Sequence, residues 1–552
     1  MEKNKIKSLK FLTLFIAFLI ITIVNNCHKE LYAEGMRDLV ATEDNNGVWS
    51  YNKGYRPFFD YQSKTTAGIK REQELFVYAK KGETIYFGSS VFNTATSLND
   101  GHEVAVILPS GRQENFDITS GGAGNINTLQ KELNGPNYGD RTDGYDPLSI
   151  YIDGTTYQEG IYTFKFCSRN NTEKQYSSML RRADDTVFNP ANAPGQVASL
   201  DITVVTEENG IYTEHTGRTW ADYLTLNTGV NQSPNLFSEV YVLTTDGYIY
   251  EVDLNGTDPY GFIFFATNRG LIDTSNNTSL YMSVFAKNNE CSQPAYTKFG
   301  EVIPVQFHKP NAPNTKYDKT YKIFFNNPSA DLPQYIKPKA YEPGSITNIY
   351  FTGINSQTGY GRVGEGGYFH FHVENATSYE LKLDFNEMTA AKKDDQGNYV
   401  LDDDGNKIQE RIQAVDRLNR KIFTDPDGVE VAFTNREYNN LPNPEDYTPV
   451  YIDGVIYLRN SCNEGENNVY WDGRDGNGHY LPEGTYGGED SKFKLTVTPK
   501  AGEYHFVMLD VENNVDGTKV KMIGDVYDSN EDLVDISEEV RSTVYYNNNN
   551  PE

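Results

Sequence analysis

Apolar residues alternate with polar residues at every second position along most of this chain, which is the spacing of half-buried β-strands. Residues 200–204, 379–385 and 493–497 follow this spacing. Turns rich in Gly, Asn and Asp separate the alternating segments. At residues 245–247 the sequence Thr-Asp-Gly predicts a tight hairpin of type I′, because Asp-Gly tolerates the positive φ values of that turn.

Helical spacing is scarce, and the sequence predicts only short helices near residues 389–393 and 408–418. Many short strands between polar turns favour antiparallel sandwiches over alternating strands and helices. The sequence therefore predicts an all-β protein made of tandem β-sandwich domains.

The first 33 residues are expected to be a signal peptide. Four lysines lie among the first ten residues, and an apolar stretch follows over residues 11–24. A helix of this length rises ~21 Å, which is short of the ~30 Å hydrocarbon core, so a membrane anchor is the weaker alternative. Ala33 precedes the expected cleavage point before Glu34. Bulky, polar residues before Cys27 disfavour lipid attachment there.

The most specific motif is a tryptophan followed by a polar turn and a return strand. It comprises Trp471, Asp472, Gly473, Asp475, Gly478, Pro482, Gly484 and Tyr486. Locally, the pattern predicts a hairpin in which the Trp ring packs on the sandwich and the Asp side chains accept backbone N–H bonds. The motif resembles the signature of the Ig-like domain of flagellar hook-capping proteins and many bacterial surface proteins. Residues 220–285 similarly resemble N-terminal regions of large bacterial surface proteins.

These resemblances imply tandem Ig-like β-sandwich domains after a signal peptide, in an extracellular, adhesin-like context. Seven prolines between residues 304 and 343 predict an extended connection before the last domain. The expected segments are a signal peptide at 1–33, a β-sandwich domain at 34–215, a second β-rich domain at 216–330, a proline-containing linker at 331–345, an Ig-like domain with a long insertion at 346–523 and an acidic, Asn-rich tail at 524–552.

The formal net charge of −28 argues against a nucleic-acid partner, because a polyanion would be repelled. The same charge favours solubility outside the cell. Three cysteines follow the signal peptide, namely Cys167, Cys291 and Cys462. Their odd number and wide spacing predict no disulfide framework, although one disulfide remains open. No transmembrane segment is expected in the mature chain.

Two acidic loops are weak candidates for calcium. Asp472, Asp475 and Asn477 supply oxygen ligands, but Arg474 occupies the third position of the loop. Residues 402–406 begin a similar pattern, which then lacks the Gly and the final Glu of an EF-hand loop. Polar hairpin turns are the preferred interpretation of both loops, and no cofactor is expected.

Two further patterns are considered for binding chemistry. Residues 359–364 read Gly-Tyr-Gly-Arg-Val-Gly, but a strand rather than a helix is predicted to follow, which disfavours a nucleotide site. His370 and His372 are predicted to lie on one face of that strand, which would supply two ligands of a metal site. No third His or Cys lies nearby in the sequence, so two exposed imidazoles on an aromatic-rich strand are the preferred interpretation. No hydrolase, metalloprotease or P-loop motif is present, so the chain is not expected to be an enzyme.

The resulting prediction is a secreted or cell-surface structural protein that is adhesin-like. It would act as a spacer or by non-catalytic binding of an extracellular protein or glycan. Exposed aromatic rings suit the C–H faces of sugars. The alternatives are a carbohydrate-active or carbohydrate-binding secreted protein, and a pilus-like or appendage-like subunit.

Overall fold

The structure, a computed structural model, describes residues 34–534 with internal gaps. The residues outside the description are 1–33, 44–48, 53–56, 61–64, 67, 71, 94–103, 167–173, 177–195, 228–235, 275–277, 281–294, 297–301, 304, 316, 356–357, 395, 486–490, 501, 503, 514–517 and 535–552. The described residues form mainly antiparallel sheets and three short α-helices, α2 (Met36–Val40), α3 (Leu129–Asn134) and α4 (Asn435–Asn439). The predicted all-β sandwich-type fold is confirmed.

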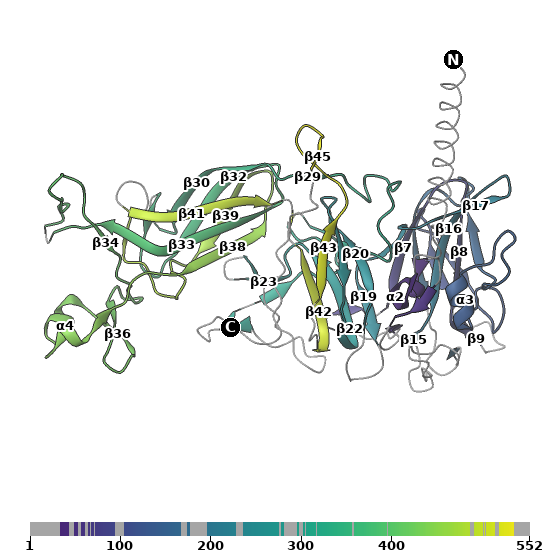
Figure 1. Ribbon diagram of the computed structural model, residues 1–552, viewed down its shortest axis with the longest axis horizontal. Coiled ribbons are helices and arrows are strands. Elements are labelled where there is room, and N and C mark those ends of the chain that lie inside the picture. The colour runs from purple at the N-terminus through teal and green to yellow at the C-terminus, as the bar shows by residue number, and fades with distance from the viewer. Residues whose placement is uncertain are drawn as a thin grey trace, which may run out of the picture.

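The first body is organised around one nine-stranded sheet. Its order is β11 (Gln113–Phe116), β10 (Val104–Ile107), β13 (Gly160–Phe166), β7 (Glu74–Ala79), β18 (Thr219–Ala221), β28 (Lys322–Phe324), β20 (Glu239–Leu243), β21 (Ile249–Asp253) and β43 (Lys519–Ile523). Figure 1 shows these strands in the right-hand and central parts of the molecule.

Two five-stranded sheets cover one face of the long sheet. The first contains β1 (Glu34–Gly35), β16 (Leu200–Glu208), β8 (Glu83–Ser89), β12 (Leu148–Tyr151) and β17 (Ile211–His215). The second contains β15 (Gln196–Val197), β4 (Phe58–Asp60), β19 (Leu224–Asn227), β22 (Asp258–Thr267) and β42 (His505–Asn513). The molecule therefore has two adjacent sandwich halves that share a sheet.

A continuous apolar core fills the space between these layers. Phe87 on β8 and Phe164 on β13 meet across the first half with ring centroids 5.1 Å apart. Phe59 on β4 meets Phe325 across the second half at 6.4 Å. On the opposite face of the long sheet, Trp220 packs in a second cluster. The period-2 alternation explains this arrangement, because successive side chains on one strand enter different layers.

The structure divides the chain differently from the expected segments. The boundary expected at residue 215 does fall between the two sandwich halves, but Phe76 pairs with Trp220 across it, so one sheet spans the boundary. The second half does not end at residue 330, because β42 and β43 return from residues 505–523 to complete its two sheets. Such pairings join residues that are distant in sequence, so the local sequence pattern does not predict them.

The second body, residues 345–500, is a sandwich inserted between strands of the first body. One sheet contains β30 (Ser345–Gly353), β32 (Gly367–Glu374) and β39 (Gly465–Trp471). The other contains β34 (Gln409–Arg411), β33 (Ser378–Ala391), β38 (Val455–Ser461) and β41 (Ser491–Lys500). Phe371 and Tyr379 meet between the sheets at 4.7 Å. In Figure 1 this body forms the left-hand part of the molecule.

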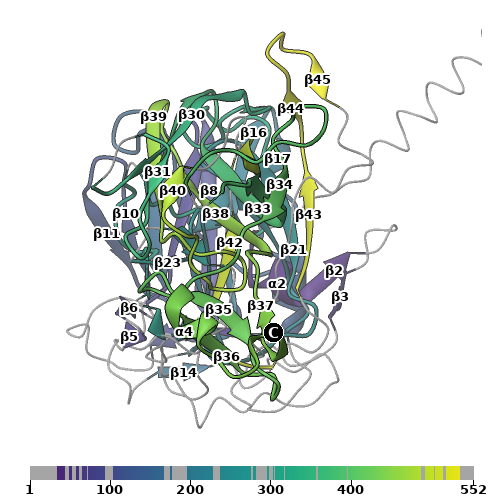
Figure 2. The same ribbon diagram turned by 90° about the vertical axis from the view of Figure 1, so that its left-hand side faces the viewer.

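Polar contacts join the inserted body to the first one where the chain passes between them. The Thr377 hydroxyl donates to Asp246 Oδ2 at 3.2 Å, and the Asn268 side chain is hydrogen-bonded to Ser461. Two stretches of chain cross this junction, one before β30 and one after β41. Beyond β43, the strands β44 (Val526–Tyr527) and β45 (Leu533–Val534) project as a hairpin, seen at the top of Figure 2.

Three local predictions differ from the structure or agree with it in part. The helices predicted at residues 389–393 and 408–418 are wrong, because β33 extends to Ala391 and pairs there with β34. Cross-strand pairing there outweighs a weak helical preference. The hairpin between β20 and β21 is present. Only Gly247 in its turn has a positive φ, at 90°, so the turn is not of type I′.

Candidate functional site

The tryptophan motif forms a tight turn at the edge of the inserted body. Trp471 ends β39, and its ring packs between the two sheets, 5.8 Å from Phe369 and 5.9 Å from Phe385. Its Nε1 donates a 2.8 Å hydrogen bond to the carbonyl of Arg474. The indole therefore holds the start of the turn against the core, as the sequence predicts.

Asp475 organises the rest of this turn through backbone hydrogen bonds. Its Oδ1 accepts from the N–H groups of Asn477 and His479 at 2.8 and 2.9 Å. Its Oδ2 accepts from the N–H of Asp453 at 2.9 Å, which links the motif to a second turn. Gly476 lies so close to that second turn that a Cβ would come 2.3 Å from the nitrogen of Val455. The sequence predicts the first turn but not its docking on the second.

The same aspartate turn recurs through the chain. In each case the carboxylate accepts the N–H groups two and four residues further on. Seven aspartates among the described residues do this: Asp153, Asp394, Asp402, Asp416, Asp425, Asp475 and Asp528. The N–H bonds from Asn398 and Asn406 are the main causes that lower the pKa of Asp394 and Asp402. Part of the acidic composition therefore serves turn formation.

The calcium candidates lie in such turns. Asp472 Oδ1 accepts from the N–H of Arg474 at 3.1 Å, and Asp472 Oδ2 lies 3.5 Å from its guanidinium Nε. Asn477 acts in the turn as a backbone donor to Asp475. In the part of the chain that the structure describes, no group of three or more His, Cys, Asp or Glu side chains is placed to hold a metal ion.

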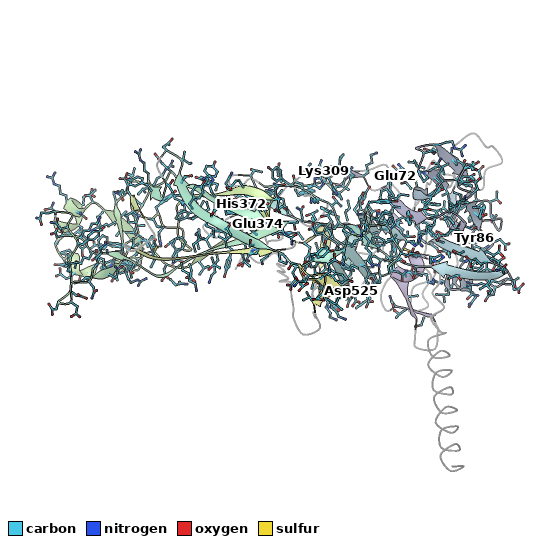
Figure 3. All side chains as sticks on the ribbon, turned by 90° about the horizontal axis from the view of Figure 1, so that it is seen from above. Glu72, Tyr86, Lys309, His372, Glu374 and Asp525 are labelled. Atoms are coloured by element: carbon cyan, nitrogen blue, oxygen red, sulfur yellow. The ribbon has the colours of Figure 1, made fainter. Side chains whose placement is uncertain are left out.

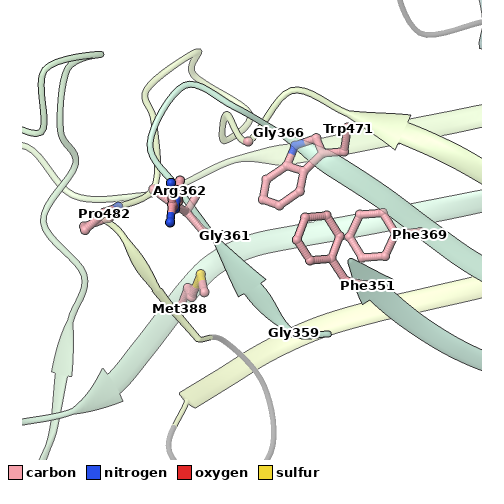
Figure 4. Close-up of a pocket in the computed structure, with 11 residues that line it drawn as sticks. Phe351, Gly359, Gly361, Arg362, Gly366, Phe369, Met388, Trp471 and Pro482 are labelled. Atoms are coloured by element: carbon pink, nitrogen blue, oxygen red, sulfur yellow. The ribbon is translucent and has the colours of Figure 1, made fainter. Parts of the chain in front are cut away.

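A small cavity brings together the glycine-rich segment and the tryptophan motif (Figure 4). Its volume is about 70 Å³, and its walls include Phe351, Gly361, Arg362, Trp471 and Pro482. A drug-sized ligand occupies a pocket of roughly 300–1,000 Å³. The glycine-rich segment leads into β32, a strand, as predicted. The cavity is thus large enough for the tip of one side chain.

The outer face of the sheet formed by β30, β32 and β39 carries an aromatic cluster. Tyr350 stacks on His370 with centroids 4.7 Å apart and planes 13° apart. Tyr368 lies 5.4 Å from Tyr470 and 6.4 Å from His370. Tyr350 and Tyr368 are 44% and 39% exposed, so ring faces are open to solvent. We call Tyr350, Tyr368, His370 and Tyr470 the outer aromatic face.

Polar groups surround this face. His370 Nε2 is hydrogen-bonded to the Thr352 hydroxyl at 2.7 Å. His372 Nδ1 lies 3.0 Å from Glu466 Oε1, and Figure 3 places His372 beside Glu374 on the same strand. The two histidines share a face, as predicted. Aromatic rings accompanied by a few hydrogen-bonding groups are a common lining of ligand-binding sites.

A polar pocket of about 420 Å³ lies in the first body. Its lining includes the carboxyl groups of Asp38, Glu239 and Asp253 and the aromatic rings of Phe237 and Tyr241. Glu239 and Asp253 are direct cross-strand partners on β20 and β21. Burial, reinforced by neighbouring carboxylates, raises the pKa of Glu239 and raises that of Tyr241 to about 12.

Several sequence-predicted residues lie outside the described residues, namely Ala33, Cys167, Cys291 and Tyr486. Cys462 is buried, and its thiol approaches the carbonyl oxygen of Ala376 at 3.6 Å. Pro482 lines the small cavity, and Gly484 begins β40 (Gly484–Thr485). No helix among the described residues has the length and apolar character needed to cross a membrane.

No family model matches the chain. A search of curated proteins likewise finds no match. Among solved structures, the chain is similar to a DUF4785 family protein from Legionella pneumophila, with 8% sequence identity, 84% of this chain and 92% of that chain covered, and a TM-score of 0.12. At this TM-score the similarity carries no argument about fold or activity.

Proposed function

We propose that this chain is a secreted or cell-surface, adhesin-like protein that acts by non-catalytic binding of a glycan. The observation that carries the proposal is the outer aromatic face. Tyr350 and Tyr368 are exposed on a three-stranded sheet rather than on a loop, so little ordering is required when a sugar stacks on them. The expected signal peptide and the resemblance to bacterial surface proteins support an extracellular location.

The inserted position of the second body suits this role. The first body anchors both ends of the insertion, which limits its rotation relative to that body. The outer aromatic face is then held in a limited range of orientations relative to the first body. In this account the tryptophan motif and its cavity are structural, because they hold the turn that supports β39.

The test is a glycan array probed with the mature chain and with Tyr350→Ala/Tyr368→Ala. A matched control replaces two exposed tyrosines of the first body, Tyr151→Ala/Tyr335→Ala. The proposal expects at least a tenfold loss of binding in the first variant and none in the control. Equal binding by both variants would place the ligand elsewhere on the molecule. Absence of any glycan binding by the wild type would contradict the proposal.

A second candidate function is supported by the polar pocket of the first body. Glycoside hydrolysis requires a pair of Asp or Glu carboxyl groups, and this pocket contains such pairs. If the chain is carbohydrate-active, Glu239→Gln abolishes release of reducing sugar from a glycan that the wild type cleaves. Binding without cleavage by the wild type favours the non-catalytic proposal.

A further inference from the structure

The first described strand is buried at its first residue. Glu34, which is 1% exposed, pairs in β1 with Ile202 of β16. Its carboxylate oxygens accept from the N–H groups of Gly217 and Arg218 at 2.6 and 2.8 Å. At the next residue, a Cβ would come 2.3 Å from the carbonyl oxygen of Leu200, so Gly35 is needed for this close pairing. The residue expected to follow the processing site is therefore part of the core.

Carboxyl groups outnumber cations around this strand. Asp38 Oδ2 accepts from the Gly35 N–H at 3.0 Å, and Asp201 is the cross-strand partner of Gly35. Glu34 and Asp201 are buried, and the side chain of Asp38 is 5% exposed. Among the nearby cations is the buried Arg37, whose Nε lies 3.9 Å from Asp38 Oδ1 and whose Nη1 donates to the carbonyl of Leu133. The guanidinium of Arg141 also acts on Asp201. The three carboxyl groups thus outnumber the guanidinium groups of Arg37 and Arg141 that act on them.

Such an excess of buried acid is costly when the groups are ionised. Burial is the largest cause that raises the pKa of Glu34 to about 7, of Asp38 to about 8 and of Asp201 to about 6. The charges of Glu34 and Asp201 raise the pKa of Asp38 further, whereas the guanidinium of Arg37 lowers it. One additional positive charge at this place would allow the carboxyl groups to ionise without leaving the core.

We infer that hydrolysis of the peptide bond between Ala33 and Glu34 supplies this charge, so that the α-ammonium group of Glu34 becomes a structural partner of the buried carboxyl groups. The inference rests on the proposed export of the chain. Water adds across the bond, leaving a carboxylate on Ala33 and an ammonium on Glu34. That ammonium lies one peptide unit from the Gly35 nitrogen that Asp38 already binds.

The same geometry sets the order of events. In the folded chain Glu34 and Gly35 are paired with β16, so a peptidase cannot take the bond into an extended substrate cleft. Processing therefore precedes folding of the first body, and the new N-terminus is enclosed as β1 pairs. An extension of even one residue displaces the charge from the carboxyl cluster.

The experiment compares two forms of the chain 34–552. One begins at Glu34, and the other carries a single Gly before it. The extension should lower the Tm of the first body by about 1–2 °C, the shift expected for a lost interaction of about 1 kcal/mol in a body of this size. In an Asp38→Asn background the difference should shrink to less than half. In an Asp153→Asn background, which alters an exposed turn, the difference should persist.

Equal Tm values for the two forms, or a difference that Asp38→Asn leaves unchanged, would overturn the inference. If Asp38→Asn does not fold, a second measurement replaces the comparison in that background. It is the rate at which an acylating reagent modifies the α-amino group of the wild-type chain. We expect acylation in the folded chain to be at least tenfold slower than in denaturant, and equal rates would contradict the inference.

N-terminal sequencing of the exported protein tests the processing site, and the first residue found should be Glu34. Another start would overturn this inference while glycan binding remained a separate result.

Discussion

The indole Nε1 of Trp471 donates a hydrogen bond to the carbonyl of Arg474, three residues further along the chain. This bond ties the end of β39 to the polar turn that follows it. Because the ring also packs against Phe369 and Phe385, one side chain joins the core of the inserted body to the turn of the tryptophan motif.

Replacing Trp471 by Phe keeps an aromatic ring in the core but removes the indole donor and part of the buried surface. We expect Trp471→Phe to destabilise the inserted body by about 1–2 kcal/mol, and Trp471→Ala by about 3–5 kcal/mol. Calorimetry of the mature chain checks this, with the exposed Tyr457→Phe as a control in the same body. An unchanged unfolding temperature in Trp471→Phe would show that the indole hydrogen bond contributes nothing to the stability of the inserted body.

Asp475 carries three backbone hydrogen bonds inside the fold, and Asp475→Asn converts one accepting oxygen into a donor. The expected loss of stability is about 1–3 kcal/mol. Asp403→Asn is the control, since its carboxyl group is exposed. Because the Asp475 oxygens are already occupied by N–H groups, excess calcium should not raise the Tm of the wild type above its value in a chelator. A clear rise with calcium would contradict this assignment.

His479 gives the same turn a pH dependence. The carboxylate of Asp475, whose Oδ2 lies 3.5 Å from Nδ1, is the largest cause that raises the pKa of His479. Glu430, 3.0 Å from Nε2, raises this pKa further, against burial. The stabilisation is complete below the ordinary histidine pKa of about 6.5 and is lost as the pH rises through the higher folded value. His479→Gln should remove this part of the pH dependence of unfolding. An identical pH profile in the variant would refute it.

The insertion itself is testable. Replacing residues 345–500 by a short Gly/Ser linker should leave the first body folded, because β42 and β43 still complete its sheets. A chain that stops at residue 500 lacks both strands and should lose the cooperative transition of that body. Circular dichroism and thermal unfolding distinguish the two truncations. Equal stability of both would mean that β42 and β43 are dispensable.

Local features of this fold were predictable from the sequence. The alternation at residues 379–385 becomes the inner face of β33, and the Trp471 hairpin forms as expected, because neighbours in sequence determine both. The pairing of residues 249–253 with 519–523 was not predictable, since only the folded chain brings them together. The outer aromatic face likewise depends on the register that sets Tyr350 opposite His370.

The central claim is that the chain acts outside the cytoplasm through its inserted sandwich. The most direct measurement uses an antibody raised against residues 345–500 on intact, unpermeabilised cells, together with blots of cytoplasm and medium. We predict that the antibody labels the cell surface or detects the processed chain in the medium. A chain confined to the cytoplasm with residues 1–33 still attached would contradict the account.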